Sequence, residues 1–312
     1  MTDNSNPDER GNQEKNLDEK PVPKITIICS APDLASQNIK NHLLNFRKWE
    51  HIEIPENFEF SAVWESADGK FRLVEIEKMH VFQDGLDAKL EAAELPASLI
   101  IFASKHSSKE KINSLTVHCT GNPSNEARLG GRPKELAVPS PAAMKSILQE
   151  MKLLAEKKGM NYDITLEVTH HGPTELSVPS LYAEIGSTEN EWKDMDAGDI
   201  AAKAILAVSL EKIPVAVGFG GGHYAIRQTG ILLETAISFG HNFPKYQLNF
   251  VDETLIMQAV KKSNADFAYF DRKSMKSEDR NRISAILEKL GIRVLKESEI
   301  REQYGNGSQI HL

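Results

Sequence analysis

Short apolar runs alternate with longer amphipathic segments along the chain from residue 24 onward. The runs, rich in Val, Ile, Leu and Phe, occupy residues 24–30, 71–77, 98–104, 114–120, 164–169, 213–219, 246–252, 267–271 and 292–297. Strands of this composition that alternate with helices are typical of a largely parallel sheet buried on both faces. The pattern therefore predicts an α/β fold, with a mostly parallel sheet covered by helices on both faces.

The clearest amphipathic segment begins at Pro141, after Ser140 as N-cap, and ends at Gly159. Its apolar positions recur on one face: Met144, Ile147, Leu148, Met151 and Leu154. Further helices are predicted over residues 199–212, 227–240 and 277–290. Residues 121–141 are instead rich in Gly and Pro, which indicates a long irregular loop.

Residues 1–23 form a polar segment with neither the apolar centre of a secretion signal nor the Arg-rich character of a transit peptide. We expect a disordered tail here and a single α/β domain over residues 24–312. No apolar run reaches the roughly 18 residues that a membrane-spanning helix needs. The two cysteines, Cys29 and Cys119, each lie in an apolar run, so we expect no disulfide framework and a reducing, cytoplasmic setting.

The formal net charge is −8, and the first 20 residues carry six acidic and three basic residues of it. A net-acidic body excludes a protein that coats nucleic acid indiscriminately, but a local basic face could hold one structured RNA. The best candidate is the helix from Pro141, where Lys145 and Lys152 share a face seven residues apart. Arg128 and Arg132 in the preceding loop would continue that face. A merely solvated helix surface is an equally good interpretation of these lysines.

Four histidines lie at the ends of different apolar runs: His106, His118, His171 and His223. Ligands of an open α/β sheet bind beyond the carboxyl ends of its strands, because loops from neighbouring strands converge there. We therefore expect these four imidazoles to share one catalytic rim.

The pair His170 and His171 needs a choice, because adjacent side chains of an extended strand point to opposite faces. The Gly172–Pro173 turn follows His171 directly. We expect His171 to face the rim and His170 to point back into the helices.

Neutral imidazole is the commonest zinc ligand, and a catalytic zinc takes about three protein ligands and an open position for water. His118, His171 and His223 are candidate ligands, with Glu184 or Glu175 as a carboxylate. The chain has no H-E-x-x-H or C-x-x-C motif, so such a site would be assembled from distant segments. A serine triad is a weaker hypothesis, because no G-x-S-x-G motif occurs.

A glycine loop, Gly220–Gly222, follows the run at 213–219. With Ala225 it matches a variant of the dinucleotide-binding fingerprint, but no acidic residue ends the next strand about 20 residues on. Three glycines let backbone N–H groups approach an anion closely. We expect Gly220, Gly221 and Gly222 to form an oxyanion or phosphate cradle, with His223 projecting into it.

Six motifs in one order make the chain resemble a known family. They are FASKHSS at 102–108, HCTGN at 118–122, THHGPTEL at 169–176, EIGSTENEW at 184–192, GGGHYA at 220–225 and GHNFPKY at 240–246. Together they resemble the archaeal and plant type of D-aminoacyl-tRNA deacylase from about residue 24 to the C-terminus. The resemblance implies a fold similar to peptidyl-tRNA hydrolases and purine nucleoside phosphorylases, zinc as cofactor, and hydrolysis of the ester between a D-amino acid and the terminal ribose of tRNA.

On this basis we expect a cytoplasmic, zinc-dependent D-aminoacyl-tRNA deacylase, monomeric, that acts in translation quality control. The expected metal ligands are His118, His171, His223 and Glu184, with His106 beside them and with Thr120 and Asn122 joining the glycine loop at the substrate. Two alternatives remain open. One is a phosphorylase-like enzyme acting on a nucleoside or small phosphorylated metabolite, suggested by the glycine loop, and the other is a non-catalytic tRNA-binding module.

Overall fold

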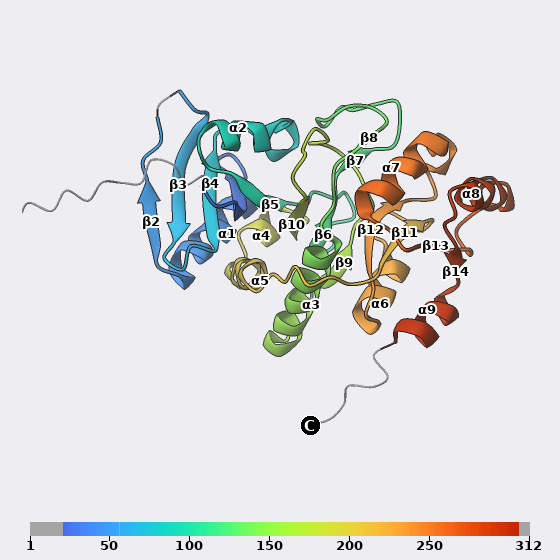
Figure 1. Ribbon diagram of the computed structural model, residues 1–312. Coiled ribbons are helices and arrows are strands. Elements are labelled where there is room, and N and C mark those ends of the chain that lie inside the picture. The colour runs from blue at the N-terminus through green and yellow to red at the C-terminus, as the bar shows by residue number, and fades with distance from the viewer. Residues whose placement is uncertain (1–20, 56, 306–312) are drawn as a thin grey trace, which may run out of the picture.

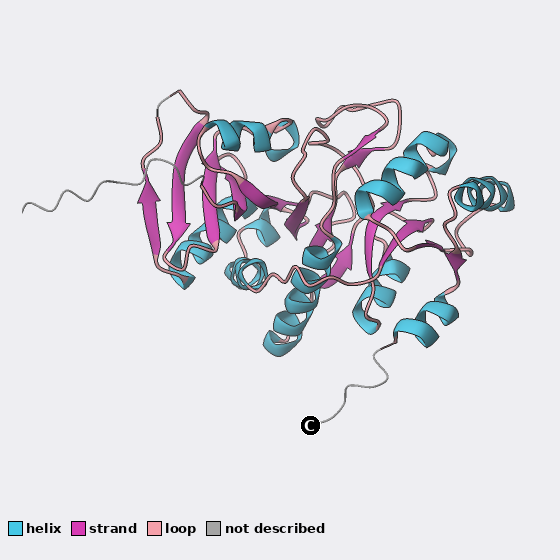
Figure 2. Cartoon of the chain, viewed as in Figure 1, coloured by secondary structure: helices cyan, strands magenta, loops and turns pink. Residues whose placement is uncertain are grey.

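The computed structural model describes residues 21–55 and 57–305, so residues 1–20 of the predicted tail lie outside the described part. Two sheets cross the middle of the molecule, and helices lie above and below them (Figure 1). Figure 2 shows the strands as a band with helices on both sides. The predicted α/β class, with helices on both faces, is confirmed.

The larger sheet has eight strands in the order β2-β3-β4-β1-β5-β10-β6-β9. In that order they are β2 (Trp49–Ile52), β3 (Phe60–Ser66), β4 (Phe71–Ile76), β1 (Lys24–Ser30), β5 (Ala97–Lys105), β10 (Ser180–Gly186), β6 (Ser114–His118) and β9 (Asp163–Leu166). Strands β4, β1, β5 and β10 are mutually parallel, and so are β6 and β9. The contact between β10 and β6 is antiparallel, so the two groups run in opposite directions.

The smaller sheet has four parallel strands: β12 (Ser238–Phe243), β11 (Val215–Phe219), β13 (Phe267–Phe270) and β14 (Val294–Leu295). A short hairpin of β7 (Gly121–Asn122) and β8 (Glu135–Leu136) lies within the loop predicted at 121–141. The helices are α1 (Leu34–Phe46), α2 (Leu86–Ala92), α3 (Pro141–Lys158), α4 (Glu189–Trp192), α5 (Met195–Leu206), α6 (Ile226–Glu234), α7 (Glu253–Ser263), α8 (Ser277–Lys289) and α9 (Glu297–Tyr304), with 3-10 turns at His80–Phe82 and Leu248–Phe250.

Side chains alternate between two environments along the central strands. On one face, Ile27, Ile101 and Val117 pack with the apolar stripes of α1, α3 and α5. On the other face, Ile28 and Phe102 pack with α2. The first of these clusters also contains side chains from the smaller sheet and from α6, so one continuous apolar core passes beneath both sheets.

The two sheets meet where the chain leaves β9. Backbone hydrogen bonds join Val168 N to His223 O at 3.0 Å, Thr169 N to Asn242 O at 2.8 Å, and Ala225 N to Leu166 O at 2.9 Å. Residues 166–169 therefore connect β9 to β12 and to the loop that follows β11. Among the described residues, no helix combines the length and the apolar character that crossing a bilayer requires.

Most helix predictions hold, with two errors of boundary. The helix expected over 199–212 is α5, which begins earlier because Asp194 caps it through the N–H groups of Asp196 and Ala197. It ends at Leu206, and beyond it Ser209 N donates to Ser146 Oγ at 3.0 Å instead of continuing the helix. The helix expected over 227–240 ends at Glu234, and the rest of that segment enters β12. The apolar run at 246–252 was expected to be a strand and forms a 3-10 turn instead.

Candidate active site

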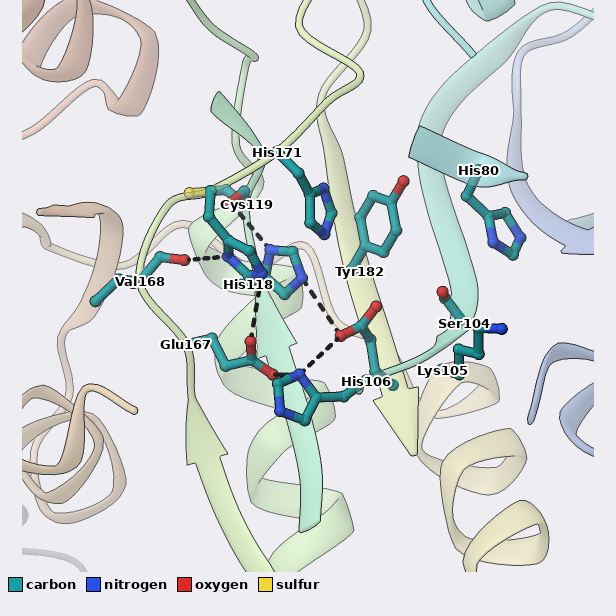
Figure 3. A network of polar contacts seen from close by, with 12 residues as sticks. His80, Ser104, Lys105, His106, His118, Cys119, Glu167, Val168, His171 and Tyr182 are labelled. Carbon is teal, nitrogen blue, oxygen red and sulfur yellow. Dashed lines mark hydrogen bonds and ion pairs between the residues drawn. The ribbon is translucent and has the colours of Figure 1, made fainter. Parts of the chain in front are cut away.

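A polar site lies on the face of the larger sheet where β10, β6 and β9 are neighbours. His118 on β6 is paired with Tyr182 on β10, and Glu184 lies two residues farther along β10. Because side chains alternate along a strand, these three point to the same face. Glu167 follows the buried Leu166 at the end of β9 and joins them. Figure 3 shows His118, Glu167 and Tyr182 facing a common space.

Other segments complete what we call the histidine-glutamate cluster. Its members are His106, His118, Glu167, His170, His171, Glu184 and His223. His106 follows β5 directly, and Gly186 on β10 leaves room for its ring, since a Cβ on Gly186 would lie 2.8 Å from His106 Cδ2. His223 comes from the loop after β11, in the smaller sheet.

The expectation of a rim at the carboxyl ends of the strands is wrong. Strand β5 is parallel to β10, but β6 is antiparallel to it, so the carboxyl ends of β5 and β6 lie at opposite edges of the sheet. His106 and His118 meet instead over the face of the sheet, on either side of Glu184. Their distances to Glu184 Oε2 are 3.8 Å from His106 Nδ1 and 3.6 Å from His118 Nε2.

Glu167 lies at the centre of the cluster. His106 Nδ1 lies 3.1 Å from Glu167 Oε1, and Glu167 Oε2 lies 2.8 Å from His223 Nε2 and 3.5 Å from His170 Nε2. The carboxylate is buried, yet neither oxygen has a well-aligned hydrogen-bond donor. Buried carboxylates normally have such donors, so this one is short of partners.

The charges in the cluster are set by these contacts. Burial favours the neutral acid, but close contacts with His106 and His223 outweigh it and hold the pKa of Glu167 well below its ordinary range. Burial likewise opposes protonation of His106, yet Glu167 outweighs it and raises the pKa of His106. Burial raises the pKa of Glu184. Glu167 is therefore the permanent anion of the site, while His106 and Glu184 titrate closer to neutrality.

Three histidines have the same orientation. In each, the ring Nδ1–H donates to a backbone carbonyl: His118 to Cys119 O at 3.1 Å, His170 to Val168 O at 2.8 Å, and His171 to Gly172 O at 2.7 Å. A carbonyl can only accept, so in the neutral form of each ring Nε2 keeps its lone pair. One ring nitrogen of each imidazole lies within 4.8 Å of the others, and His118 Nε2 is buried with no hydrogen-bond partner.

The expectation that His170 points away from the site is wrong, and His171 does lie in the site as expected. The argument for choosing one of them assumed an extended strand, but β9 ends at Leu166 and His171 adopts a left-handed backbone with φ of 45°. That conformation is uncommon for a residue with a side chain, and it brings both imidazoles to the same side. Burial, followed by the charge of neighbouring histidines, lowers the pKa of His170 and brings that of His171 to about 3.

Of the two carboxylates predicted as metal ligands, one lies in the cluster and the other does not. Glu184 belongs to the cluster, whereas Glu175 lies at the surface and forms an ion pair with Arg132. The sequence prediction missed Glu167, because this residue lies within the apolar run at 164–169 and looks like a strand position. The strand ends at Leu166, so Glu167 is free to enter the site.

The glycine loop does not offer the expected cradle. Gly220 N donates to Phe243 O at 2.8 Å and Gly221 N donates to Ser274 Oγ at 2.6 Å, so both amides are already bonded. Gly220 and Gly221 have φ of 97° and 88°, values that favour glycine, and they lead the chain into His223. Of the three, only Gly222 keeps an amide without a hydrogen bond assigned within the described part of the chain.

Thr120 and Asn122 hold loops that lie next to the site. Thr120 Oγ1 donates to Pro173 O at 2.6 Å, and Asn122 Nδ2 donates to Gly130 O at 2.8 Å. Both side chains are buried; Thr120 holds the loop after the two histidines, and Asn122 holds the loop between β7 and β8. Their expected contact with substrate stays a prediction.

The expected basic face on α3 is wrong for Lys145. Its ammonium points inward and donates to the carbonyls of Leu232, in the last turn of α6, and of Thr235 and Ile237, which follow α6. Lys152 is partly exposed and is paired with Glu156.

The two arginines of the predicted basic face lie at the surface. Arg128 is paired with Glu126 and Arg132 with Glu175. Whether Lys152, Arg128 or Arg132 contacts tRNA stays a prediction.

Comparison with known proteins assigns the family. A family model described as D-aminoacyl-tRNA deacylase matches residues 93–295. A D-aminoacyl-tRNA deacylase of Methanosarcina barkeri is 77% identical over 306 residues, covering 98% of this chain and 100% of that protein. One from Archaeoglobus fulgidus is 39% identical over 281 residues, covering 89% and 98%. The crystal structure of AF0625, a conserved protein of unknown function, matches with a TM-score of 0.84 at 39% identity, covering 91% of this chain and 98% of that one. The chain belongs to the D-aminoacyl-tRNA deacylase family.

Proposed function

We propose that this deacylase hydrolyses the ester bond of D-aminoacyl-tRNA with the help of a zinc ion held by His118, His170 and His171. The products are a free D-amino acid and tRNA. The observation that carries the proposal is the shared orientation of the three rings, with every Nδ1–H on a carbonyl and one ring nitrogen of each converging. Histidines that bind metals are held in this way, because the outer hydrogen bond fixes the tautomer and the ring plane.

The donor set suits zinc. Three neutral imidazoles with room for water form a common catalytic zinc site, and the low pKa values of His170 and His171 keep both rings neutral at physiological pH. His118 Nε2 is buried without a hydrogen-bond partner. A metal-ligating nitrogen is expected to lack such a partner before its ion is bound. Zinc bound there would act as a Lewis acid and lower the pKa of a coordinated water.

The expected ligand set of His118, His171, His223 and Glu184 is revised by this arrangement. His223 groups with His106 and Glu167, and these three form a separate set of converging donor atoms. We assign this second set to proton transfer and not to zinc binding, since the carboxylate of Glu167 contacts both His106 and His223.

The chain's own groups then divide the proton transfers. Glu184, whose pKa burial raises, lies 3.6 Å from His118 Nε2 and accepts a proton from the attacking water. His106, whose pKa Glu167 raises, donates a proton to the departing ribose oxygen. Tyr224 supports this role, because its hydroxyl oxygen accepts from the Nε2–H of protonated His106 at 3.0 Å while His106 Nδ1 faces Glu167.

Matched substrates test the activity. The protein should release D-tyrosine from D-tyrosyl-tRNA and leave L-tyrosyl-tRNA largely intact, as measured by the loss of acid-precipitable labelled amino acid. Chelation should abolish the release and added zinc should restore it. Release of neither amino acid by the zinc-loaded protein would contradict the proposal.

The cellular setting is part of the same proposal. Aminoacyl-tRNA is made and used in the cytoplasm, and we place the enzyme there. Cys29 and Cys119 are both buried and free, with pKa values that burial raises to about 12, as in a protein that needs no disulfide.

A further inference from the structure

A cavity of about 460 Å³ lies beside the glycine loop, outside the histidine-glutamate cluster. Its wall includes Lys245 and Tyr246 after β12, and Ser274, Lys276 and Asp279 at the start of α8. We call it the Tyr246 pocket. Lys245 and Tyr246 end the GHNFPKY motif, to which the cluster assigns no role.

Hydrogen bonds fasten this pocket to the cluster. Gly221 N donates to Ser274 Oγ, and Lys245 N donates to Gly221 O at 3.0 Å. Gly221 is only two residues from His223, whose Nε2 lies 2.8 Å from Glu167. Two residues span at most about 7 Å. Since stacked nucleotides advance by about 3.4 Å each, the pocket lies within a few nucleotides of a bond cleaved at the cluster.

The charge of the pocket suits phosphate. Lys245 and Lys276 are exposed, as are Arg272 and Lys273 between β13 and α8, and none of the four forms an ion pair within residues 21–55 and 57–305. Asp279, the acid in the wall, is already paired with Arg282 at 3.3 Å. Elsewhere many lysines are neutralised, as Lys152 is by Glu156.

An aromatic ring lies next to these cations. Tyr246 is 53% exposed, although a ring of this size usually buries most of its area. The buried Leu248 and Met275 form an apolar floor beside it. An exposed ring flanked by unpaired cations is the combination that single-stranded nucleic acid recognises, because bases stack on the ring while phosphates meet the cations.

A second cavity that adjoins the cluster has the opposite character. It measures about 400 Å³, includes Tyr224 in its wall, and carries the carboxylates of Glu110 and Asp163 among apolar side chains such as Ile112. Two carboxylates repel phosphate, so the charge on that side is unsuited to nucleic acid.

We propose that the Tyr246 pocket binds the single-stranded 3′-terminal nucleotides of tRNA, with a base against Tyr246 and backbone phosphates on Lys245 and Lys276. This proposal rests on the proposed function in one respect: RNA bound in the pocket places its terminal ester at the adjacent histidine-glutamate cluster, where that ester is hydrolysed.

Binding of uncharged tRNA tests the pocket without any hydrolysis. Two RNAs are compared by fluorescence anisotropy over a salt series: full-length tRNA, and the same tRNA lacking its last three nucleotides. Tyr246→Ala should weaken binding of the full-length RNA by about 5- to 150-fold, the range for one stacked base. Lys245→Ala/Lys276→Ala should lower the log-log salt slope by about 1.4, since each phosphate on a single strand contributes about 0.7.

The shortened tRNA provides the internal control. Its affinity should be weaker for the unaltered protein and should change little in either variant. Lys48→Ala/Lys70→Ala, which also removes two exposed charges but beside β2 and β4 at the far end of the larger sheet, should leave both RNAs unaffected.

Each alternative outcome overturns the assignment in a recognisable way. Equal loss of both RNAs would place another part of tRNA in the pocket. Unchanged binding in both variants, with D-tyrosyl-tRNA still hydrolysed, would leave the proposed function intact and reject the pocket. A protein that binds the full-length RNA as expected but hydrolyses nothing would reject the proposed function and keep the pocket.

Discussion

Two buried polar regions of this protein differ in one respect that separates scaffold from site. Lys145 is 9% exposed, and its ammonium has three carbonyl acceptors, from Leu232, Thr235 and Ile237, for its three protons. In the histidine-glutamate cluster, the two buried oxygens of Glu167 face imidazoles without a well-aligned hydrogen bond, and His118 Nε2, 3.6 Å from Glu184 Oε2, makes no hydrogen bond. We call the first region the Lys145 cap.

The comparison teaches how to interpret buried polarity. A buried charged group with all its hydrogen bonds formed stabilises one conformation and has no free donor or acceptor for a ligand. A buried group with bonds missing costs free energy unless something binds to it. The cluster therefore points to a ligand, and the Lys145 cap to the stability of α3 against the end of α6.

The largest effect should follow removal of a histidine from the cluster. His170→Ala and His171→Ala should each lose bound zinc and lower kcat/KM by more than about 100-fold, since even residues that only orient metal ligands often account for 10- to 100-fold. Elemental analysis beside single-turnover deacylation checks this. Zinc loss in one variant alone would mean that the other ring is no ligand.

Glu167→Gln should keep the shape of the cluster but remove its anion. We expect kcat/KM to fall by about 100-fold, within the range for groups that assist proton transfer. Glu167 raises the pKa of His106, so in the variant the activity that needs protonated His106 should begin to decline at a lower pH. A pH profile of kcat/KM measures the shift, and an unmoved alkaline limb would separate His106 from the acid role.

Lys145→Met should produce the reverse pattern. Three buried carbonyls would lose their donor, so the free energy of unfolding should fall by about 2–4 kcal/mol, as read from urea denaturation. The zinc content and kcat/KM of the folded fraction should stay unchanged. Lys152→Ala, on the exposed side of the same helix, is the control and should alter stability by less than about 0.5 kcal/mol. A Lys145→Met protein that is stable but inactive would remove the distinction between the two regions.

An effect confined to acidic pH concerns His241, a buried histidine whose ring bonds to Ala137 O through Nε2 at 3.1 Å. Burial lowers its pKa to about 3 from the ordinary 6.5. Below pH 6.5 the unfolded chain binds a proton that the folded protein does not, so His241 makes stability fall as the pH drops toward 3, by up to about 1.4 kcal/mol per pH unit. His241→Gln should flatten the acid side of the stability profile. An equally steep profile would assign that slope to other groups.

The fold class and four of the cluster's histidines could be predicted from the sequence, because apolar runs and helix caps are local signals. The helix from Pro141 to Lys158 needed only its cap, its stripe and Gly159. The position of the site could not be predicted, because it depends on the direction of the strands. Strands β10 and β6 are antiparallel, so the site lies on a face of the sheet and not at the carboxyl ends of its strands.

The misplaced single residues have the same physical origin. His170 joined the site because the left-handed backbone at His171 broke the alternation on which the prediction depended. Lys145 looked exposed by helical spacing, but the end of α6 packs against that side of α3 and supplies carbonyls. Tertiary contacts of this kind leave no mark in local periodicity.

Metal reconstitution tests the central claim most directly. Zinc is removed from the protein, returned in substoichiometric steps, and the hydrolysis of D-tyrosyl-tRNA is measured at each step beside the bound zinc. The account predicts activity that rises in proportion to zinc bound, and neither binding nor recovery in His118→Ala. Full hydrolysis by metal-free protein, or recovery without His118, would contradict it.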